Sequence, residues 1–311
     1  MNLASIDVGT NSTRLLITTL NNGIFKTLAR EMEITRLGKG IRDTGNISND
    51  NSSLTIETLK KYKLLIDKFK VKKYKAVGTS ALRRASNSSV FIDKTFKETG
   101  IKLDIISGIE EANFSFNGAV RSLISAGKFE IPPKLLVADI GGGSSEFIFG
   151  DRDFNISGVK SVDIGCVRET EDFLRSDPPA KQEIMLLREA IKEKMEEEFS
   201  DFYKNEEFII LGLAGTVSSL AAMSINLKKY KMEKLNYLPL ELEKIKMIFK
   251  NLCKLTLNER KKVAGLDPKR ADVIIGGIAI VIETLYFFKK DRIIVSENDI
   301  LDGIIYSLVN F

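Results

Sequence analysis

Two glycine-containing turns in the sequence carry residue types that bind phosphate. Each turn follows an apolar run that ends in an acid: Asp7 stands two residues before Gly9, and Asp139 stands two residues before Gly141. Glycine allows successive backbone N–H groups to converge on an anion, and hydroxyl or amide side chains add neutral donors. A third candidate, Gly215-Thr216, stands where a strand is expected to enter a helix. The predicted phosphate contacts are Gly9, Thr10, Asn11, Ser12, Gly141, Gly142, Gly143, Ser144, Ser145, Gly215 and Thr216.

For any one of these turns, an ordinary structural hairpin is the alternative, with the acid accepting hydrogen bonds from its own turn. Three such segments in one chain, two of them behind an aspartate, favour phosphate binding. The sequence contains neither G-x-x-x-x-G-K-[ST] nor a G-x-G-x-x-G between a strand and a helix. The prediction is therefore a hairpin that cradles phosphate in each of two lobes.

The chain has no histidine, so acid–base chemistry has to come from other side chains. This excludes Ser-His-Asp and Cys-His catalysis and histidine-ligated metals. Glu110 and Glu111 open an expected helix, where the helix dipole favours acids even without a function. The need for a base that activates water makes them candidates. Asp7 and Asp139, at the expected carboxyl ends of strands, suit an oxygen-ligated cation such as Mg²⁺.

Two arginines, Arg14 and Arg83, each follow a polar turn at a strand edge. A guanidinium group binds phosphate as a fork and neutralises charge in phosphoryl transfer, although a solvated surface charge is the alternative for either residue. The net charge of +5 favours anionic partners but is too small and too dispersed to indicate nucleic-acid binding. We therefore expect no nucleic-acid partner.

The rest of the composition is typical of an ordinary globular protein. Cys166 and Cys253 are far apart and form no metal or disulfide motif, so both are expected to be reduced and structural. No stretch reaches the roughly 18 apolar residues of a membrane span, and the N-terminus lacks a signal-peptide pattern. A cytoplasmic location without membrane attachment is the expectation.

The elements that position these residues alternate between strands and helices, which predicts an α/β protein. The order of apolar strand, Asp-x-Gly, hydroxyl residues and second strand occurs near the N-terminus and again over residues 135–149. This repeat predicts two related lobes that face a cleft. The boundary between them is expected just before a proline-containing linker over residues 127–134. We expect a first lobe of residues 1–124 with a C-terminal helix in 296–311, and a second lobe of residues 125–295.

Seven segments resemble one known family, in family order and along nearly the whole chain. They are ASIDVGTNSTR (residues 4–14), GTSALR (78–83), ISGIEEA (106–112), DIGGGSSE (139–146), GCVR (165–168), GLAGT (212–216) and RADVI (270–274). The chain resembles the exopolyphosphatase/guanosine pentaphosphate phosphatase (Ppx/GppA) family of the actin/hexokinase/Hsp70-like superfamily. The resemblance implies two ribonuclease-H-like (actin-like ATPase) lobes around an interdomain cleft, with the C-terminal helix returning to the first lobe.

The resemblance also implies an activity and roles for particular residues. The activity is Mg²⁺-dependent hydrolysis of terminal phosphate from inorganic polyphosphate, with conversion of pppGpp to ppGpp as a further reaction. Glu111 would be the general base, and Arg14 and Arg83 would hold the terminal phosphates. Asp139 and Glu146 match the acidic positions associated with the metal, joined by Asp7 as a further candidate. Family analogy alone adds a homodimer.

Three departures from the family pattern put substrate preference in doubt. Many relatives have His-Gly where this chain has Asn236-Tyr237, and the usual SDxGLREG is SENDILDG at residues 296–303. The helical domains that many relatives carry after the two lobes are not in this sequence, so no channel formed by them is expected.

Three other functions stay open at this point. The main substrate could be pppGpp. The chain could instead be an ATP-dependent kinase of the same superfamily with Gly276-Gly277 at an adenosine site, although close helix packing is the simpler interpretation of those glycines. It could also be a non-catalytic, nucleotide-sensing regulator or scaffold.

Overall fold

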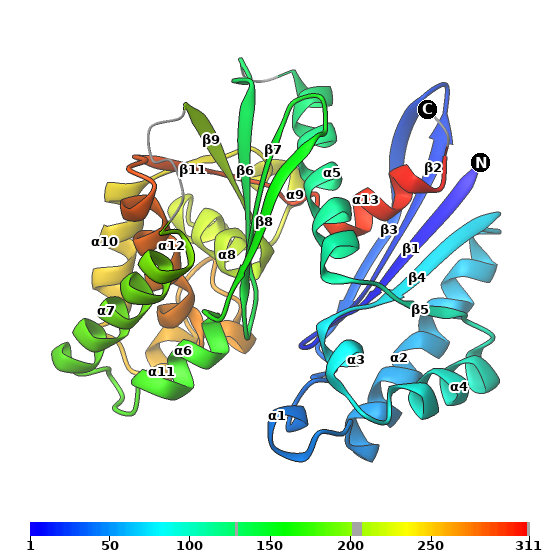
Figure 1. Cartoon of the computed structure of the whole chain (residues 1–311), viewed down its shortest axis with the longest axis horizontal. Coiled ribbons are helices and arrows are strands. Elements are labelled where there is room, and N and C mark those ends of the chain that lie inside the picture. The colour runs from blue at the N-terminus through cyan, green and yellow to red at the C-terminus, as the bar shows by residue number, and fades with distance from the viewer. Residues whose placement is uncertain (128–129, 201–206, 310–311) are drawn as a thin grey trace. The chain divides into compact units, whose positions relative to one another are not determined.

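The computed structural model describes residues 1–127, 130–200 and 207–309. Two compact units are present (Figure 1): the first combines Met1–Gly118 with the C-terminal segment from Ile300, and the second is Ala119–Asp299. Residues 128–129 of the expected linker and 310–311 of the expected first lobe lie outside the described residues. The lobe bounds expected from the sequence stay a prediction, because compactness does not show that either part folds on its own.

The first unit is a five-stranded sheet with helices on both faces. The strand order is β3-β2-β1-β4-β5, in which β1, β2 and β3 are antiparallel and β4 and β5 run parallel to β1. The division between the units falls within α5. The elements are β1 (Asn2–Val8), β2 (Thr13–Asn21), β3 (Ile24–Glu33), α1 (Ile41–Thr44), α2 (Asn49–Lys68), β4 (Lys73–Gly78), α3 (Ser80–Arg84), α4 (Ser88–Thr99), β5 (Leu103–Ile105), α5 (Gly108–Ala126) and α13 (Ile300–Ser307).

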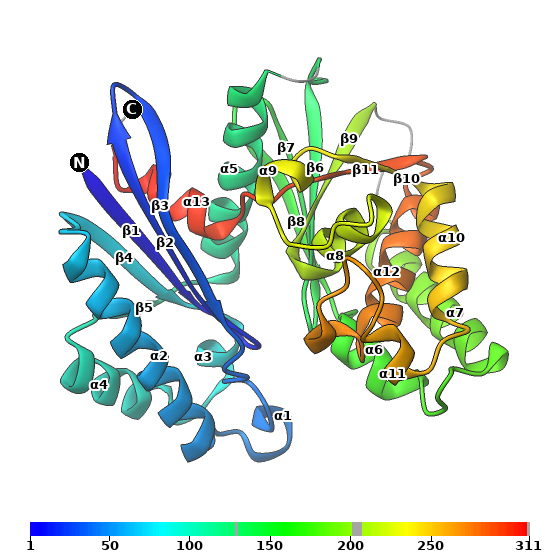
Figure 2. The same cartoon turned by 180° about the vertical axis from the view of Figure 1, so that it is seen from behind.

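Alternate side chains of β1 face two different cores. Ile6 packs with α2 and α4 on one face of the sheet, whereas Leu3 packs with α13 on the other (Figures 1 and 2). The Ser5 hydroxyl donates a 2.8 Å hydrogen bond to the carbonyl of Leu301 on that second face. Since strand side chains alternate with a period of two, Asp7 shares the α13 face with Leu3 and Ser5.

The second unit is a six-stranded sheet in the order β10-β11-β9-β6-β7-β8. The strands are β6 (Lys134–Ile140), β7 (Ser145–Asp151), β8 (Ile156–Val162), β9 (Phe208–Leu213), β10 (Pro239–Glu241) and β11 (Arg292–Val295). The helices are α6 (Cys166–Phe173), α7 (Lys181–Glu198), α8 (Ala214–Ser224), α9 (Met232–Leu235), α10 (Leu242–Leu252), α11 (Leu257–Arg260) and α12 (Ile274–Phe287), with a 3₁₀ turn at Pro268–Arg270.

The two units repeat one topology. β8-β7-β6-β9-β11 of the second sheet has the same order and strand directions as β3-β2-β1-β4-β5 of the first, and β10 is an addition at the edge. The β1–β2 turn and the β6–β7 turn therefore occupy equivalent places. The two-lobed α/β arrangement predicted from the repeated sequence pattern is confirmed.

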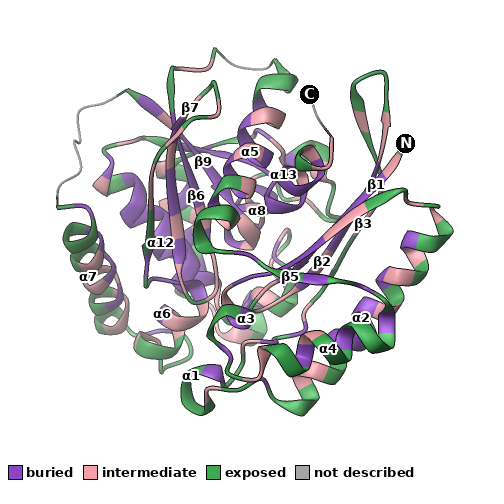
Figure 3. Cartoon of the chain, turned by 45° about the vertical axis from the view of Figure 1, so that its right-hand side comes forward, coloured by how far each residue is buried: buried purple, intermediate pink, exposed green. Residues whose placement is uncertain are grey.

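Helix α12 forms the centre of the second core and is buried along most of its length (Figure 3). A Cβ atom on Gly276 would lie 2.5 Å from Thr170 Oγ1, and one on Gly277 would lie 2.4 Å from Thr216 Oγ1. Both distances are below van der Waals contact, so these glycines permit close packing against α6 and α8, as the simpler interpretation predicts. Although α12 is strongly apolar, none of the described helices has both the length and the apolar character needed to cross a membrane.

Candidate functional site

Hydrogen bonds hold the backbone of the turn between β1 and β2, while its polar side chains remain available to a ligand. The Gly9 N–H donates to the Ser12 carbonyl at 3.0 Å, while the carbonyls of Thr10 and Asn11 accept hydrogen bonds from the N–H groups of Gly38 and Arg36 at 2.9 Å each. The side chains of Thr10, Asn11 and Ser12 make no hydrogen bond to any described residue. The turn therefore keeps neutral donors available for an anion.

A partly buried ion pair adjoins this turn. Asp7 and Arg14 are directly opposite each other on β1 and β2, and Arg14 donates from Nε and Nη2 to Asp7 Oδ2 at 2.9 and 2.6 Å. Asp7 is almost fully buried, whereas Arg14 is partly exposed. In the structure Asp7 therefore orients a phosphate-binding candidate, and its expected role as a metal ligand stays a prediction.

The second arginine of the first unit contacts the candidate base. Arg83, on α3 just after β4, donates from Nη1 to Glu111 Oε2 at 2.7 Å and to the carbonyl of Ile106 at 3.0 Å. The Arg83 and Glu111 side chains are 30% and 26% exposed, so both can meet a ligand. The first unit thus places a carboxylate next to a cation that suits phosphate.

The neighbouring Glu110 has a different, structural role. Its Oε2 accepts hydrogen bonds from the Ser107 N–H and the Ser107 hydroxyl, both at 2.9 Å, and its own N–H donates to the Ser107 hydroxyl at 3.2 Å. This is a capping box at the start of α5. The hydrogen bonds from Ser107 lower the pKa of Glu110. Of the two adjacent glutamates, only Glu111 is left as a candidate base.

In the second unit, the β6–β7 turn is closed in the same way. The Gly141 N–H donates to the Ser144 carbonyl at 3.0 Å, and a Cβ on Gly141 would lie 2.8 Å from that oxygen. The carbonyls of Gly141 and Gly142 accept hydrogen bonds from the N–H groups of Cys166 and Val167 at the start of α6, both at 2.9 Å. Glycine is required at residue 141 because a backbone carbonyl occupies the space of a side chain.

Two carboxylates stand side by side at the ends of these strands. Asp139 on β6 is directly opposite Glu146 on β7. Glu146 Oε1 accepts hydrogen bonds from the hydroxyls of Ser144 and Ser161 at 2.7 and 3.0 Å. Acids that face each other across strands repel, and a cation relieves this repulsion.

These two acids fit a Mg²⁺ site in which protein carboxylates supply only some of the ligands. Within the described parts of the chain, no group of three or more histidine, cysteine, aspartate or glutamate side chains could hold a metal ion. Mg²⁺ is commonly bound through one or two carboxylates, with water and substrate phosphate as its other ligands. The donor set of Asp139 and Glu146 is therefore consistent with this ion.

The third predicted loop, at the start of α8, brings in an arginine from elsewhere in the chain. A Cβ on Gly215 would lie 1.9 Å from Arg270 Cζ, so the guanidinium group rests directly on this glycine. Thr216 is buried, with its hydroxyl against Gly277, which leaves its backbone N–H as the candidate phosphate contact. Ala214, just before the glycine, has a φ of +69°.

Arg270 is a candidate that sequence reasoning missed. The residue belongs to the family-like segment 270–274, but that segment suggested no function for it. Its place on Gly215 arises from tertiary packing between segments far apart in the chain. A guanidinium group on a glycine turn is the arrangement expected where an anion binds.

The two cysteines are not suited to chemistry. Both are free thiols, Cys166 buried and Cys253 partly buried. Burial raises the pKa of Cys166, and it raises the pKa of Cys253 to about 11. Since the thiolate is the reactive form, both groups are inert near neutral pH, as expected for structural cysteines.

Two of the three departures from the family pattern contact each other. Asn236 accepts a hydrogen bond from the Glu297 N–H at 3.0 Å and donates to Asn298 Oδ1 at 2.7 Å. The Tyr230 hydroxyl is hydrogen-bonded to the Glu297 carboxylate. The changes at 236–237 and at 296–303 therefore belong to one polar network.

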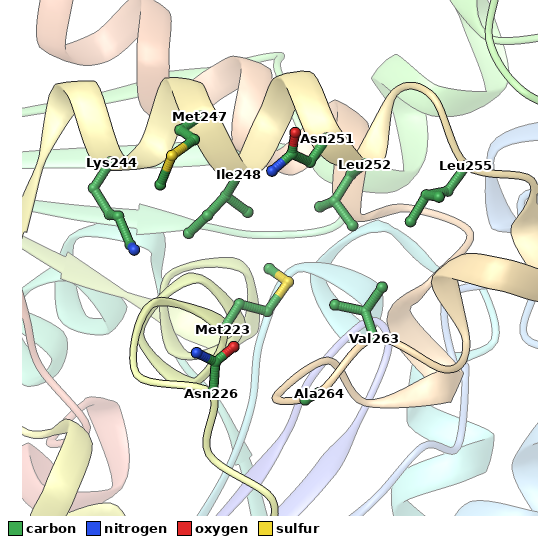
Figure 4. Close-up of a pocket in the computed structure, with 10 residues that line it drawn as sticks. All are labelled: Met223, Asn226, Lys244, Met247, Ile248, Asn251, Leu252, Leu255, Val263 and Ala264. Carbon is green, nitrogen blue, oxygen red and sulfur yellow. The ribbon is translucent and has the colours of Figure 1, made fainter.

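A hollow of about 220 Å³ in the second unit lies apart from all of these residues (Figure 4). Its lining is mainly apolar, and no predicted site residue contributes to it. Phosphate requires polar and cationic contacts, so this hollow is unsuited to it. The lining residues are Met223, Asn226, Lys244, Met247, Ile248, Asn251, Leu252, Leu255, Val263 and Ala264.

Known proteins resemble this chain along nearly its whole length. Exopolyphosphatase 2 of Mycobacterium tuberculosis is 36% identical over 320 residues, which cover 98% of each chain. A bifunctional 3-dehydroquinate synthase/phosphatase of Fusobacterium nucleatum is also 36% identical over 97% of this chain, which spans only 46% of that longer protein.

A solved structure confirms the fold. The crystal structure of the Aquifex aeolicus Ppx/GppA family member is 35% identical and has a TM-score of 0.85, with 99% of this chain and 97% of the other covered. Residues 16–310 match the model of the Ppx/GppA phosphatase family. The chain therefore belongs to the Ppx/GppA phosphatase family.

Proposed function

We propose that the protein is an exopolyphosphatase that releases terminal phosphate from inorganic polyphosphate, and that it also converts pppGpp to ppGpp. The contact between Arg83 and Glu111 carries the proposal, because it holds a carboxylate base beside a phosphate-binding cation. Family membership and the 36% identity to an exopolyphosphatase over nearly the full length of both chains support it.

In the proposed reaction, Glu111 orients a water molecule and accepts its proton. The water oxygen forms a bond to the terminal phosphorus, and the bond from that phosphorus to the bridging oxygen breaks. The products are orthophosphate and a chain shortened by one unit. Arg14, Arg83 and the N–H groups of the turn between β1 and β2 stabilise the charge on the equatorial oxygens.

We propose that Asp139 and Glu146 hold Mg²⁺ in the second unit. When bound, the ion would neutralise charge on the substrate phosphates. The opposed carboxylates and the lack of imidazole or thiolate partners support this choice over softer metals.

Removing either carboxylate is expected to weaken the metal requirement in a measurable way. Asp139→Asn and Glu146→Gln should each raise the Mg²⁺ concentration for half-maximal activity by at least about tenfold, because one oxygen ligand loses its charge. Asp151→Asn is the matched control, since Asp151 caps its own turn at the opposite end of the same strand pair. A Mg²⁺ titration of phosphate release measures the effect, and equal shifts in all three variants would contradict the assignment.

The activity itself is tested by measuring orthophosphate release. The substrates are long-chain polyphosphate, tripolyphosphate, pppGpp and ATP, each with and without Mg²⁺. We expect release from polyphosphate and a slower release from pppGpp. Phosphorylation of a small acceptor by ATP without polyphosphate hydrolysis would instead show a kinase, and tight ppGpp binding without turnover would show a regulator.

We also propose a cytoplasmic location from the sequence pattern and a homodimer from family analogy. Light scattering on the purified protein measures the mass of the assembly, and a monomer at micromolar concentration would contradict the second proposal.

A further inference from the structure

One segment of the first unit has a net positive charge larger than the net charge of the whole chain. Residues 60–75 include eight of the 47 basic residues and one of the 42 acidic residues. Their net charge is +7, so the remainder of the chain has a net charge of −2. The expectation that the basic excess is dispersed is therefore wrong for this segment.

Four of these lysines lie together at the end of the first sheet where strands β1 and β4 begin. Lys68 is the last residue of α2, and the Lys72 N–H donates to the Asn2 carbonyl at the start of β1. Lys73 begins β4 and is paired with Leu3. We call Lys68, Lys70, Lys72 and Lys73 the lysine edge. It is at the amino ends of β1 and β4, whereas the turn between β1 and β2 follows the carboxyl end of β1.

The lysine edge differs from Lys60 and Lys63 of α2, which are neutralised by acids. Lys60 forms ion pairs with Glu57 and Glu98, and Lys63 forms one with Asp67. The four lysines of the edge are exposed, and none forms an ion pair with a residue that the structure describes. A solvated surface normally mixes charges of both signs, because neighbouring like charges repel. This concentration of one sign is therefore unfavourable for the fold alone.

Lys70 also occupies a position where glycine would fit better. Its φ is +50°, and the Val71 N–H closes the end of α2 by donating to the Ile66 carbonyl at 3.1 Å. Glycine and asparagine are the residues that favour this left-handed position at a helix end. A lysine here adds charge at some conformational cost, which is consistent with a function for the charge.

We propose that the lysine edge binds the distal part of a polyphosphate chain while the chain terminus occupies the turn between β1 and β2. This proposal rests on the proposed function. Polyphosphate is a linear polyanion, and unpaired lysines bind such a chain chiefly by releasing its counterions. Binding at a second place raises the effective concentration of the terminus at the site.

The aromatic residues of the segment favour polyphosphate over a single-stranded nucleic acid. Nucleic-acid surfaces of this kind add exposed aromatic rings on which bases stack. Tyr62 is buried and donates to the Thr13 carbonyl, and Phe69 packs partly against the core. Tyr74 is also partly buried in that core. The lysine edge therefore offers charge without a stacking surface.

The geometry also predicts a dependence on chain length. Leu3, beside Lys73, is five residues from Val8, which is about 16 Å at roughly 3.3 Å per strand residue. Tripolyphosphate is too short to reach both places, whereas a long chain can contact both. The lysine edge should therefore affect long substrates only.

The test changes all four lysines of the edge to glutamine. We expect KM for long-chain polyphosphate to rise about tenfold or more and its salt dependence to decrease, with kcat within about twofold of wild type. KM for tripolyphosphate and for pppGpp should not change. The unfolding temperature should stay the same or rise, because mutual repulsion is removed.

A matched variant controls for net charge. Lys228, Lys229, Lys250 and Lys254 are exposed lysines of the second unit; changing them to glutamine removes the same charge at other places. An equal rise in KM in this variant would overturn the proposal, as would an unchanged KM in the lysine-edge variant. Equal competition by single-stranded RNA of matched charge would also overturn it.

Direct binding separates this proposal from the proposed activity. Fluorescence anisotropy with labelled long-chain polyphosphate measures affinity in the wild type and in the lysine-edge variant, whether or not phosphate is released. Weaker binding in the variant supports the lysine edge even if no substrate is hydrolysed. Phosphate release with unchanged binding in the variant supports the activity and overturns the lysine edge.

Discussion

Replacing Glu111 with glutamine is expected to lower kcat for phosphate release by about 10³-fold, within the range typical of losing a general base. This corresponds to about 4 kcal/mol of transition-state stabilisation. Glutamine keeps the size of the side chain and an oxygen that can accept the hydrogen bond from Arg83, so KM and the unfolding temperature should change little. Steady-state kinetics with polyphosphate, together with thermal unfolding, measure the three quantities. A kcat within tenfold of wild type would show that Glu111 is not the base.

The adjacent Glu110 provides an internal control. Glu110→Gln keeps a side chain that can form the capping box with Ser107, so kcat should stay within about twofold of wild type. Its effect should appear in the pH dependence of stability instead. The pKa of Glu110 is lowered in the folded protein, so its stabilisation is complete above the ordinary pKa and is lost as pH falls through the lowered value. In the Glu110→Gln variant, this pH-dependent contribution to the free energy of unfolding should be absent. A loss of kcat equal to that of Glu111→Gln would contradict the division of roles.

Replacing Gly215 with alanine is expected to reduce kcat/KM by about 10²-fold, the size of effect typical of removing one preorganised hydrogen-bond donor from an active site. The added Cβ would coincide with the guanidinium of Arg270, which must then leave its place on the turn. Arg270→Ala should produce a similar loss, and the double variant should be no worse than either single one. Such non-additivity is the signature of two residues that act through one contact.

Ser218→Ala is the matched control on the same helix. Among the residues that the structure describes, its hydroxyl donates only to the Ala214 carbonyl, at 3.2 Å, so its removal should leave kcat/KM within about twofold of wild type. Far-UV circular dichroism and thermal unfolding identify any variant that loses activity by unfolding. Additive losses from Gly215→Ala and Arg270→Ala in correctly folded protein would contradict the proposed contact.

Much of the framework could be predicted because its signals are local. The apolar runs on either side of Gly9 and of Gly141 indicate strand, turn and strand, and both turns close with the same hydrogen bond from glycine. Helix α2 begins directly after Ser48, whose side chain accepts from the Asn51 N–H, and serine is a common capping residue. Short-range spacing and turn chemistry are sufficient for features of this kind.

The remaining features depend on contacts that no local pattern contains. The place of Glu111 beside Arg83 comes from a contact between residues 28 positions apart, whereas the Ser107–Glu110 capping box is a local pattern. Arg270 reaches Gly215 through packing of segments far apart in the chain. Likewise, nothing in the sequence indicates that Asn236 contacts the segment after β11.

The equivalent hairpins of the two units differ at one cross-strand position. The first pairs Asp7 with Arg14, and the second pairs Asp139 with Glu146. In the first hairpin the counter-ion is part of the polypeptide and is always present. In the second, under the proposed metal site, the counter-ion is exchangeable and comes from solution. A duplicated hairpin would thereby yield one half whose acid is permanently balanced by an arginine and one whose state follows the concentration of free divalent cation.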